Sequence, residues 1–208
     1  MTINTILSEV QDKSNNTSTT SHKLKSDLWN YFKLPENKKY CGTVVELGTH
    51  IGETTRVLSY LFDNVITVMN APQDKAKKLN SDRDNITYLQ FDLYSSWKNS
   101  ELIKYDVDVV FIDAVHDQQA VNSDLLNSLN YLSLDKRKIF VFDDYGPEEL
   151  DGIRNVVDGY IKNNILQKEK YIGFEPKYEL VNERENRVIK YVGWEGIICK
   201  QIADIEVD

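Results

Sequence analysis

The chain has 208 residues, of which 41% are hydrophobic and 28% are charged. This is the composition of an ordinary globular protein, at a length suited to one domain with a full core. Lys and Arg number 25 against 33 Asp and Glu, which gives a net charge of −8. The acidic balance disfavours a nucleic acid as partner, because nucleic-acid binders present a basic face.

The N-terminal part of the chain is polar, and 14–21 consist only of Ser, Thr and Asn. Such a stretch buries too little surface to offset its ordering entropy. We therefore predict a flexible arm over 1–22 and a globular domain over 23–208. The domain is expected to begin with a helix that ends at Pro35 and carries, at helical spacing, the apolar residues Leu24, Leu28, Tyr31 and Phe32. This apolar helix is a candidate contact of a homodimer.

Beyond this helix, two kinds of segment alternate along the chain. Helical spacing of apolar residues predicts helices at 53–61, 72–80, 117–131 and 148–165. Runs of β-branched and apolar residues predict strands at 43–47, 65–69, 86–91, 107–112 and 139–142. Strands separated by helices need crossover connections, so these five strands should be parallel, with helices on both faces of the sheet.

The last part of the chain breaks the alternation. Further strands are expected at 178–181, 188–192 and 196–200, with no helix between them. The polar link 182–186 indicates an antiparallel hairpin. The predicted fold is therefore an α/β sheet that is mostly parallel and has an antiparallel C-terminal end.

Two cysteines and the distribution of apolar residues bear on the compartment. Cys41 and Cys199 form no metal-binding spacing, so we expect two reduced thiols in a cytoplasmic protein. The N-terminal sequence lacks the basic start and apolar run of a signal peptide. No apolar run approaches the roughly 18 residues of a membrane span, so we expect no membrane partner.

A glycine-containing turn follows the first predicted strand, in the sequence VVELGTHIGETT over 44–55. Gly48 lets the backbone turn sharply and approach a ligand closely, and Gly52 does the same where the next helix begins. A dinucleotide-binding loop would have a third glycine where this chain has His50. The turn therefore indicates a ligand site but disfavours an NAD-binding oxidoreductase; an ordinary strand–helix turn is the alternative.

Aspartates stand at the ends of the predicted strands. Asp113 ends the fourth strand, and Asp143 and Asp144 end the fifth. The carboxyl ends of neighbouring parallel strands share one edge of the sheet, where ligands bind. Three carboxylates there would repel one another unless a cation or protons compensate, and oxygen ligands favour Mg²⁺ or Ca²⁺. The alternative is that these aspartates are solvated and form caps and turns.

Four segments, in this order, resemble the class I S-adenosylmethionine (SAM)-dependent methyltransferases. They are ELGTHIG, FIDAVHDQQAVNSDL, VFDDYGPEELDGIRNVVDGYI and WEGIICK, within about 40–201. The third resembles the macrocin O-methyltransferase type, small-molecule O-methyltransferases that act on sugar hydroxyls with Mg²⁺. The resemblance implies a Rossmann-like seven-stranded sheet with helices on both faces, SAM as cofactor, and O-methylation of a small-molecule hydroxyl.

The resemblance also implies roles for matched positions. Glu46 would interact with the methionine end of SAM or brace the loop, and Asp92 would accept from the adenine amino group or cap the next helix. The catalytic candidates are His116 and Asp113, and the metal candidates are Asp113, Asp143 and Asp144. The cofactor-binding candidates are Glu46, Gly48, Thr49, Gly52, Asn70, Asp92 and Asp113.

Two positions depart from the family pattern. The acid that usually ends the second strand and binds both ribose hydroxyls is replaced by Met69, followed by Asn70. Another acid, the general base of the metal-dependent sugar enzymes, is replaced by Val115. The adjacent His116 has a side chain suited to base catalysis near neutrality, although a structural role is also open.

These departures leave two hypotheses besides a methyltransferase of small molecules. One is a methyltransferase-like binding or scaffold protein without turnover. The other is an RNA methyltransferase, which the acidic charge disfavours. Methyl transfer depends largely on positioning SAM in line with the nucleophile, so loss of one base does not by itself remove activity.

Overall fold

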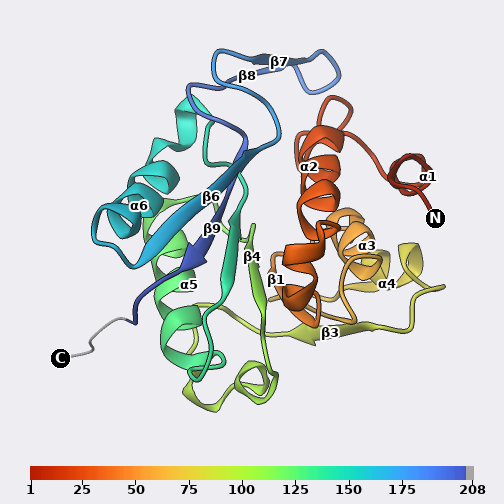
Figure 1. Ribbon diagram of the computed structural model, residues 1–208. Coiled ribbons are helices and arrows are strands. Elements are labelled where there is room, and N and C mark those ends of the chain that lie inside the picture. Colours follow the sequence, from red (N-terminus) through yellow and green to blue (C-terminus); the bar gives the residue numbers. More distant parts are fainter. Residues whose placement is uncertain (205–208) are drawn as a thin grey trace.

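The computed structural model describes residues 1–204, and its centre is a seven-stranded sheet (Figure 1). The strand order is β3-β2-β1-β4-β5-β9-β6. The parallel strands are β1 (Thr43–Leu47), β2 (Asn64–Met69), β3 (Ile86–Gln90), β4 (Val109–Ile112) and β5 (Ile139–Phe142). Strand β9 (Gly196–Gln201) lies antiparallel between β5 and β6 (Leu166–Ile172). The predicted mostly parallel sheet with an antiparallel end is confirmed.

Helices cover both faces of the sheet (Figure 1). The α-helices are α1 (Ile3–Leu7), α2 (His22–Phe32), α3 (Glu53–Ser59), α4 (Asp74–Leu79), α5 (Gln118–Tyr131) and α6 (Asp151–Lys162). Short 3-10 helices occupy Pro35–Tyr40, Trp97–Asn99, Glu101–Lys104 and Glu148–Leu150. Helices α2 and α3 lie on one face, and α5 and α6 lie on the other.

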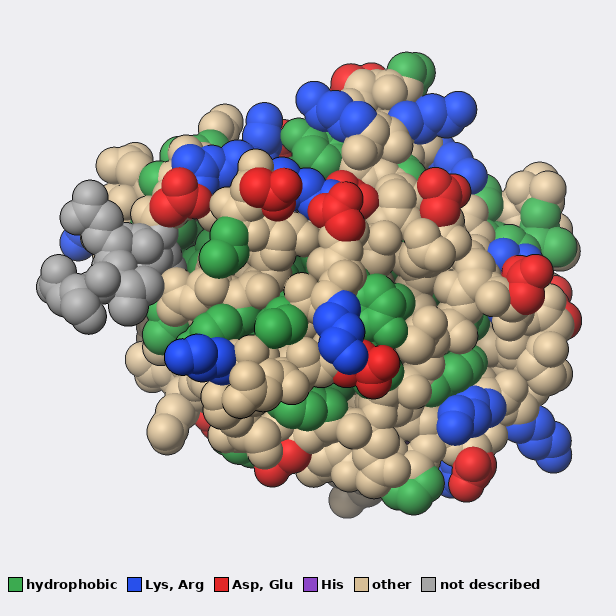
Figure 2. Space-filling view, turned by 90° about the horizontal axis from the view of Figure 1, so that it is seen from below, with side chains coloured by type: hydrophobic (Ala, Val, Ile, Leu, Met, Phe, Trp, Pro, Cys, Tyr) green, Lys and Arg blue, Asp and Glu red, His purple; other side chains and the backbone are tan. Residues whose placement is uncertain are grey.

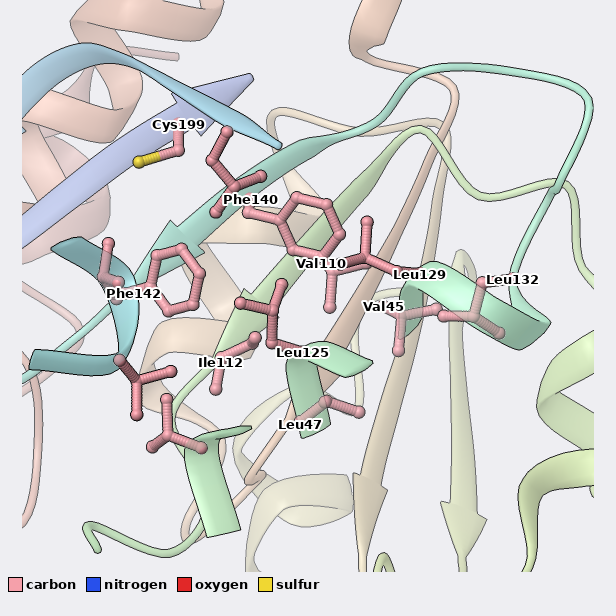
Figure 3. Packing of buried hydrophobic residues seen from close by; sticks show 14 of the residues in the cluster. Val45, Leu47, Val110, Ile112, Leu125, Leu129, Leu132, Phe140, Phe142 and Cys199 are labelled. Atoms are coloured by element: carbon pink, nitrogen blue, oxygen red, sulfur yellow. The ribbon is translucent and has the colours of Figure 1, made fainter. Parts of the chain in front are cut away.

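The two-residue period of the strands divides the core between these faces. In β4, Val109 and Phe111 pack with the residues of α2 and α3, whereas Val110 and Ile112 pack with those of α5 and α6. Figure 3 shows the second layer, in which Leu125 of α5 lies against the strands. Both faces of the central strands are therefore buried, which explains why their sequences are continuously apolar.

The C-terminal third differs in detail from the predicted strands. Helix α6 ends at Lys162, and β6 occupies the edge of the main sheet. The strands β7 (Glu179–Asn182) and β8 (Arg187–Lys190) form a separate two-stranded hairpin instead of joining that sheet. The sequence LQKEKYI of β6 gave no strand signal because three successive side chains of this edge strand are exposed and break the apolar pattern.

The segment 1–22 is packed on the domain, at odds with the expectation of a flexible arm. Ile6 of α1 and the polar Ser21 are both fully buried. The entropy argument assumed that polar residues gain nothing from burial, but here they meet charged partners inside the domain. The apolar residues of α2, proposed as a dimer contact, face the core instead.

The cysteines and the helices also bear on earlier expectations. Cys41 and Cys199 are both free thiols, and Cys199 is buried in the core layer of Figure 3. No helix within residues 1–204 is both long and apolar enough to cross a membrane.

Candidate functional site

A pocket of about 510 Å³ lies at the carboxyl ends of the parallel strands. This is the edge of an open α/β sheet at which ligands bind, and the volume is within the range of small-molecule sites. Residues that follow β1 to β5 line it, together with 17–19 of the N-terminal segment and Arg187 and Ile189 of the hairpin. The site therefore combines the expected strand ends with two segments distant in sequence.

The loop after β1 is shaped by its two glycines. Gly48 has a φ of +105°, and a Cβ there would lie 2.0 Å from the carbonyl oxygen of Asp113. Gly52 has a φ of +85° where α3 begins, and a Cβ there would lie 2.7 Å from that of Ala76. Both positions require glycine, because L side chains rarely adopt such φ values and have no room here. Gly48 lines the pocket, so a ligand can approach its backbone.

Behind this loop, Glu46 braces the structure. The carboxylate is fully buried, and Oε2 accepts hydrogen bonds of 2.5 Å from the hydroxyls of Thr55 and Thr67. Burial raises the pKa of Glu46 to about 7. Thr49 lies in the same layer, with its hydroxyl 2.9 Å from Gln73 Oε1. Of the predicted cofactor residues, Glu46, Thr49 and Gly52 support the loop and are not among the pocket-lining residues.

Other predicted residues do line the pocket at the ends of β2 and β3. Asn70 follows β2 and Asp92 follows β3, and Met69 and His50 border the same space. The carboxylate of Asp92 also accepts a 3.1 Å hydrogen bond from the Tyr94 amide. Asp92 thus makes a local turn beside the pocket and does not cap the next helix, Trp97–Asn99, whose N-cap is Ser96, so the capping role is wrong and the adenine contact stays a prediction.

The acidic cluster predicted at the ends of β4 and β5 is present. Asp113, Asp143, Asp144 and His116 all line the pocket. His116 Nδ1 is bonded to Asp144 Oδ2, and His116 Nε2 lies 3.8 Å from Asp113 Oδ1. The imidazole therefore lies between two carboxylates, with one nitrogen anchored and the other facing Asp113.

The close packing of these groups shifts their pKa values. The hydrogen bond to Asp144 raises the pKa of His116 to about 9. Burial raises the pKa of Asp113 to about 7 and that of Asp143 well above its ordinary value. Burial also disfavours the charge of Asp144, but Lys13 and His116 outweigh this and hold its pKa below the ordinary range. Of the three aspartates, Asp144 is thus the one whose charged form the surroundings favour.

Lys13 of the N-terminal segment reaches into this cluster, which sequence reasoning missed. Its ammonium lies 2.9 Å from Asp144 Oδ1, 3.5 Å from Asp143 Oδ2 and 3.6 Å from Glu195 Oε1, and its side chain is 3% exposed. Burial alone would lower the pKa of Lys13, but the three carboxylates raise it well above the ordinary value. One lysine in a polar segment gives no sequence signal of such a role.

The cluster also contains side chains that could bind a metal ion. Single ligand atoms of Asp113, His116 and Asp144 lie within 4.8 Å of one another. However, one oxygen of Asp144 is bound by Lys13 and the other by His116. An ammonium 2.9 Å from that carboxylate would repel a divalent ion beside it. The predicted trio Asp113, Asp143 and Asp144 therefore does not fit Mg²⁺ while Lys13 is in place.

Comparisons with known proteins give the fold but not the activity. No family model and no curated protein matches the sequence. A candidate O-methyltransferase from Klebsiella pneumoniae is 14% identical, with a TM-score of 0.59 over 96% of this chain and 89% of that one. The O-methyltransferase from Bacillus cereus, solved with SAH, is 16% identical, with a TM-score of 0.58 over 97% and 90%.

A third similar structure is a candidate RNA methyltransferase from Pyrococcus horikoshii. It is 12% identical, with a TM-score of 0.61 over 97% of both chains. At these identities the likeness establishes the fold alone. The chain has the Rossmann-like fold of class I SAM-dependent methyltransferases, as the sequence resemblance implied.

Proposed function

We propose that the protein is a SAM-dependent methyltransferase that methylates a hydroxyl of a small molecule. The observation that carries this proposal is one continuous pocket that joins the Gly48 loop to the His116–Asp144 pair. SAM, when bound, supplies an electrophilic methyl group. Gly48 lines the pocket without a side chain, so its backbone is open to the close contact that such a cofactor needs.

The residues at the ends of β2 and β3 are proposed to hold the cofactor. Asn70 has an amide that can donate to and accept from ribose hydroxyls, and Asp92 can accept from an amino group. Both line the pocket on the same side as Gly48. Met69 offers no such hydrogen bond, so we expect the ribose to be held more weakly than by a carboxylate.

His116 is proposed as the general base. Its Nδ1 is held by Asp144, which leaves Nε2 to accept the proton that the acceptor hydroxyl loses as it attacks the methyl group. The carboxylate of Asp113 lies 3.8 Å from the same nitrogen. Because the pKa of His116 is about 9, the imidazole is largely protonated at neutral pH, and the base form grows as pH rises.

The Mg²⁺ assistance that the resemblance implies finds no support in this arrangement, since Lys13 and His116 already bind both oxygens of Asp144. The resemblance to sugar O-methyltransferases leaves a sugar hydroxyl as one acceptor to include in a screen. No step of the proposed mechanism requires a metal ion.

A scaffold without turnover is the second candidate, and Met69 and Val115 favour it because both border the pocket without a polar group. RNA methylation has less support. The net charge is −8, and on the face shown in Figure 2 basic side chains are interspersed with acidic ones. RNA-binding surfaces instead gather Lys and Arg into a basic patch.

Calorimetric titration with SAM and its demethylated product tests the proposal first. We expect micromolar binding of both, followed by formation of the demethylated product when a panel of hydroxylated small molecules, sugars included, is supplied. Binding without turnover on any acceptor would favour the scaffold, and no binding of either compound would contradict the proposal. His116→Asn is the matched control, expected to bind SAM but to turn over slowly.

A further inference from the structure

Two features of the cluster at the ends of β4 and β5 need explaining together. Four acidic side chains meet there, namely Asp113, Asp143, Asp144 and Glu195, and the last three surround Lys13. Glu195 is fully buried, and Asp143 is 5% exposed. Carboxylates buried at such short range need a compensating cation or bound protons.

The ammonium of Lys13 occupies the centre of this group. It lies within 3.6 Å of one oxygen from each of Asp143, Asp144 and Glu195. The second oxygen of Asp144 is bonded to His116, the only other basic side chain that touches these carboxylates among the ion pairs of residues 1–204. Lys13 and His116 thus share the charge compensation that a metal ion provides in metal-dependent enzymes.

The segment that carries Lys13 is fixed from several sides. Ser21 donates to Glu195 through its amide at 2.9 Å and its hydroxyl at 2.5 Å. The Gln11 amide donates to Glu53 Oε1 at 3.2 Å, and Thr17 is bonded to Glu185 in the turn between β7 and β8. These contacts are made by residues on both sides of Lys13 in the sequence, so the surrounding fold holds Lys13 in the cluster.

We propose that Lys13 is the built-in cation of this carboxylate cluster and takes the place of a divalent metal ion. Only the catalytic consequence rests on the proposed function: methyl transfer would proceed without added metal. The acceptor hydroxyl would then be bounded by the ammonium and imidazole instead of by a metal ligand sphere. The metal-excluding role of Lys13 stands on the geometry of the cluster and needs no SAM.

Removal of Lys13 should convert the cluster into a metal site. Asp143 Oδ1 is buried and has no hydrogen-bond partner within residues 1–204, and Lys13→Met would also free Asp143 Oδ2 and Asp144 Oδ1 from the ammonium. Carboxylate oxygens with an imidazole nitrogen suit Mn²⁺ and Mg²⁺. The substitution keeps the length and apolar stem of lysine while it removes the charge.

A second buried lysine provides a matched control. Lys25 of α2 is fully buried and also contacts the N-terminal segment. Its ammonium reaches the Gln11 carbonyl at 3.4 Å, the Thr19 hydroxyl at 3.3 Å and the Thr20 carbonyl, and within residues 1–204 it meets no carboxylate at hydrogen-bond distance. Lys25→Met therefore loosens the same segment without unmasking carboxylates. It separates loss of the ammonium from loss of the packing.

The experiment is Mn²⁺ titration of the full chain, followed by electron paramagnetic resonance and thermal unfolding. We expect no specific Mn²⁺ binding to the wild type or to Lys25→Met. Lys13→Met should bind one Mn²⁺ and gain roughly 5 °C or more in Tm at saturation. Specific Mn²⁺ binding to the wild type would overturn the proposal, as would a folded Lys13→Met variant that binds none.

Two further arms keep the result decisive. If Lys13→Met does not fold, Lys13→Arg retains the cation and is expected to fold without binding Mn²⁺, and Mn²⁺ binding to it would count against the proposal. SAM calorimetry on the same samples, with and without EDTA, reports the proposed function separately. Loss of wild-type SAM binding on EDTA treatment would contradict the metal-free site, whereas failure to bind SAM in any buffer would contradict the methyltransferase assignment alone.

Discussion

The two halves of the pocket handle polar groups in different ways. The half at the ends of β1–β3 is built from a close backbone turn at Gly48 and from hydrogen bonds behind it, such as those of Thr49 and Glu46. The half at the ends of β4 and β5 is a network of buried charges around Lys13 and His116. The first half is made by one local motif, whereas the second needs side chains from both ends of the chain.

Because of this difference, mutations in the two halves should affect different properties. Backbone geometry cannot be replaced by another contact, so the first half should lose ligand affinity when its turn is altered. Charges that compensate one another can be redistributed, so the second half should keep its ligand and lose rate.

Removal of the proposed base should have the largest effect. Asn in His116→Asn can still donate to Asp144 but cannot take up a proton, so we expect kcat to fall about 100- to 10,000-fold. The dissociation constant for SAM should stay unchanged, because the ring lies in the charged half. Product formation and calorimetry measure the two quantities; a parallel loss of SAM affinity would mean that the halves are not separable.

Alteration of the turn should have the opposite signature. A methyl group at position 48 would lie 2.0 Å from the Asp113 carbonyl oxygen, so the loop of Gly48→Ala must move. We expect about 100-fold weaker SAM binding, since small misplacements carry penalties of this order. The control is Gly159→Ala in α6, where a Cβ would meet nothing within 4 Å. It should stabilise the fold by about 0.5–1 kcal/mol in urea unfolding; unchanged SAM affinity in Gly48→Ala would refute the prediction.

The charged half should also impose a pH dependence. The pKa of His116 is raised to about 9, so each pH unit below that value reduces the neutral base about tenfold. We expect kcat to rise between pH 7 and 9 and then level off. The sign for stability is the reverse: the contribution of the imidazolium is complete below about pH 6.5 and is lost as pH rises through 9. A rate profile that is flat over this range would exclude His116 as the base.

We expect the smallest effect when a charged side chain is introduced at the end of β2. Met69 ends β2 and lines the pocket where a carboxylate could accept from hydroxyls. Hydrogen bonds to charged groups contribute about 1.5–3 kcal/mol before the cost of desolvation. We therefore expect Met69→Glu to tighten SAM binding by about threefold to tenfold. The isosteric Met69→Gln should give less than half of that gain in free energy, and equal affinities for both variants would argue against a ribose contact at this position.

The sequence predicts the parts of the molecule that local patterns determine. Each of the parallel strands, the glycine turn and the aspartates at the strand ends follows from a run of neighbouring residues, so the sequence alone predicts them. Strand β6 was missed, since the exposed Lys and Glu side chains of an edge strand carry no apolar alternation. The hairpin was predicted but not its separation from the main sheet.

The candidate site was predictable only in part for the same reason. Asp113, Asp143, Asp144 and His116 were chosen from the strand ends and do meet in the pocket. Their cation was not foreseen, because Lys13 lies in a polar stretch and its partner Glu195 is almost the whole chain away. Long-range pairs of this kind leave no periodic trace in a single sequence. The metal prediction depended on three charges whose compensation the sequence could not reveal.

The contacts of Glu195 constrain the order in which parts of the site can form during synthesis. Ser21 and Glu195 are 174 residues apart in the chain, so a nascent chain has its N-terminal segment outside the ribosome long before its partner is synthesised. The Gly48 turn and the strands beside it can form from residues already made, whereas Lys13 must wait for β9 and the residues before it. Pairs so distant also close slowly. We expect a newly made chain to form the part of the pocket beside Gly48 first, and the cluster around Lys13 only after Glu195 has been synthesised.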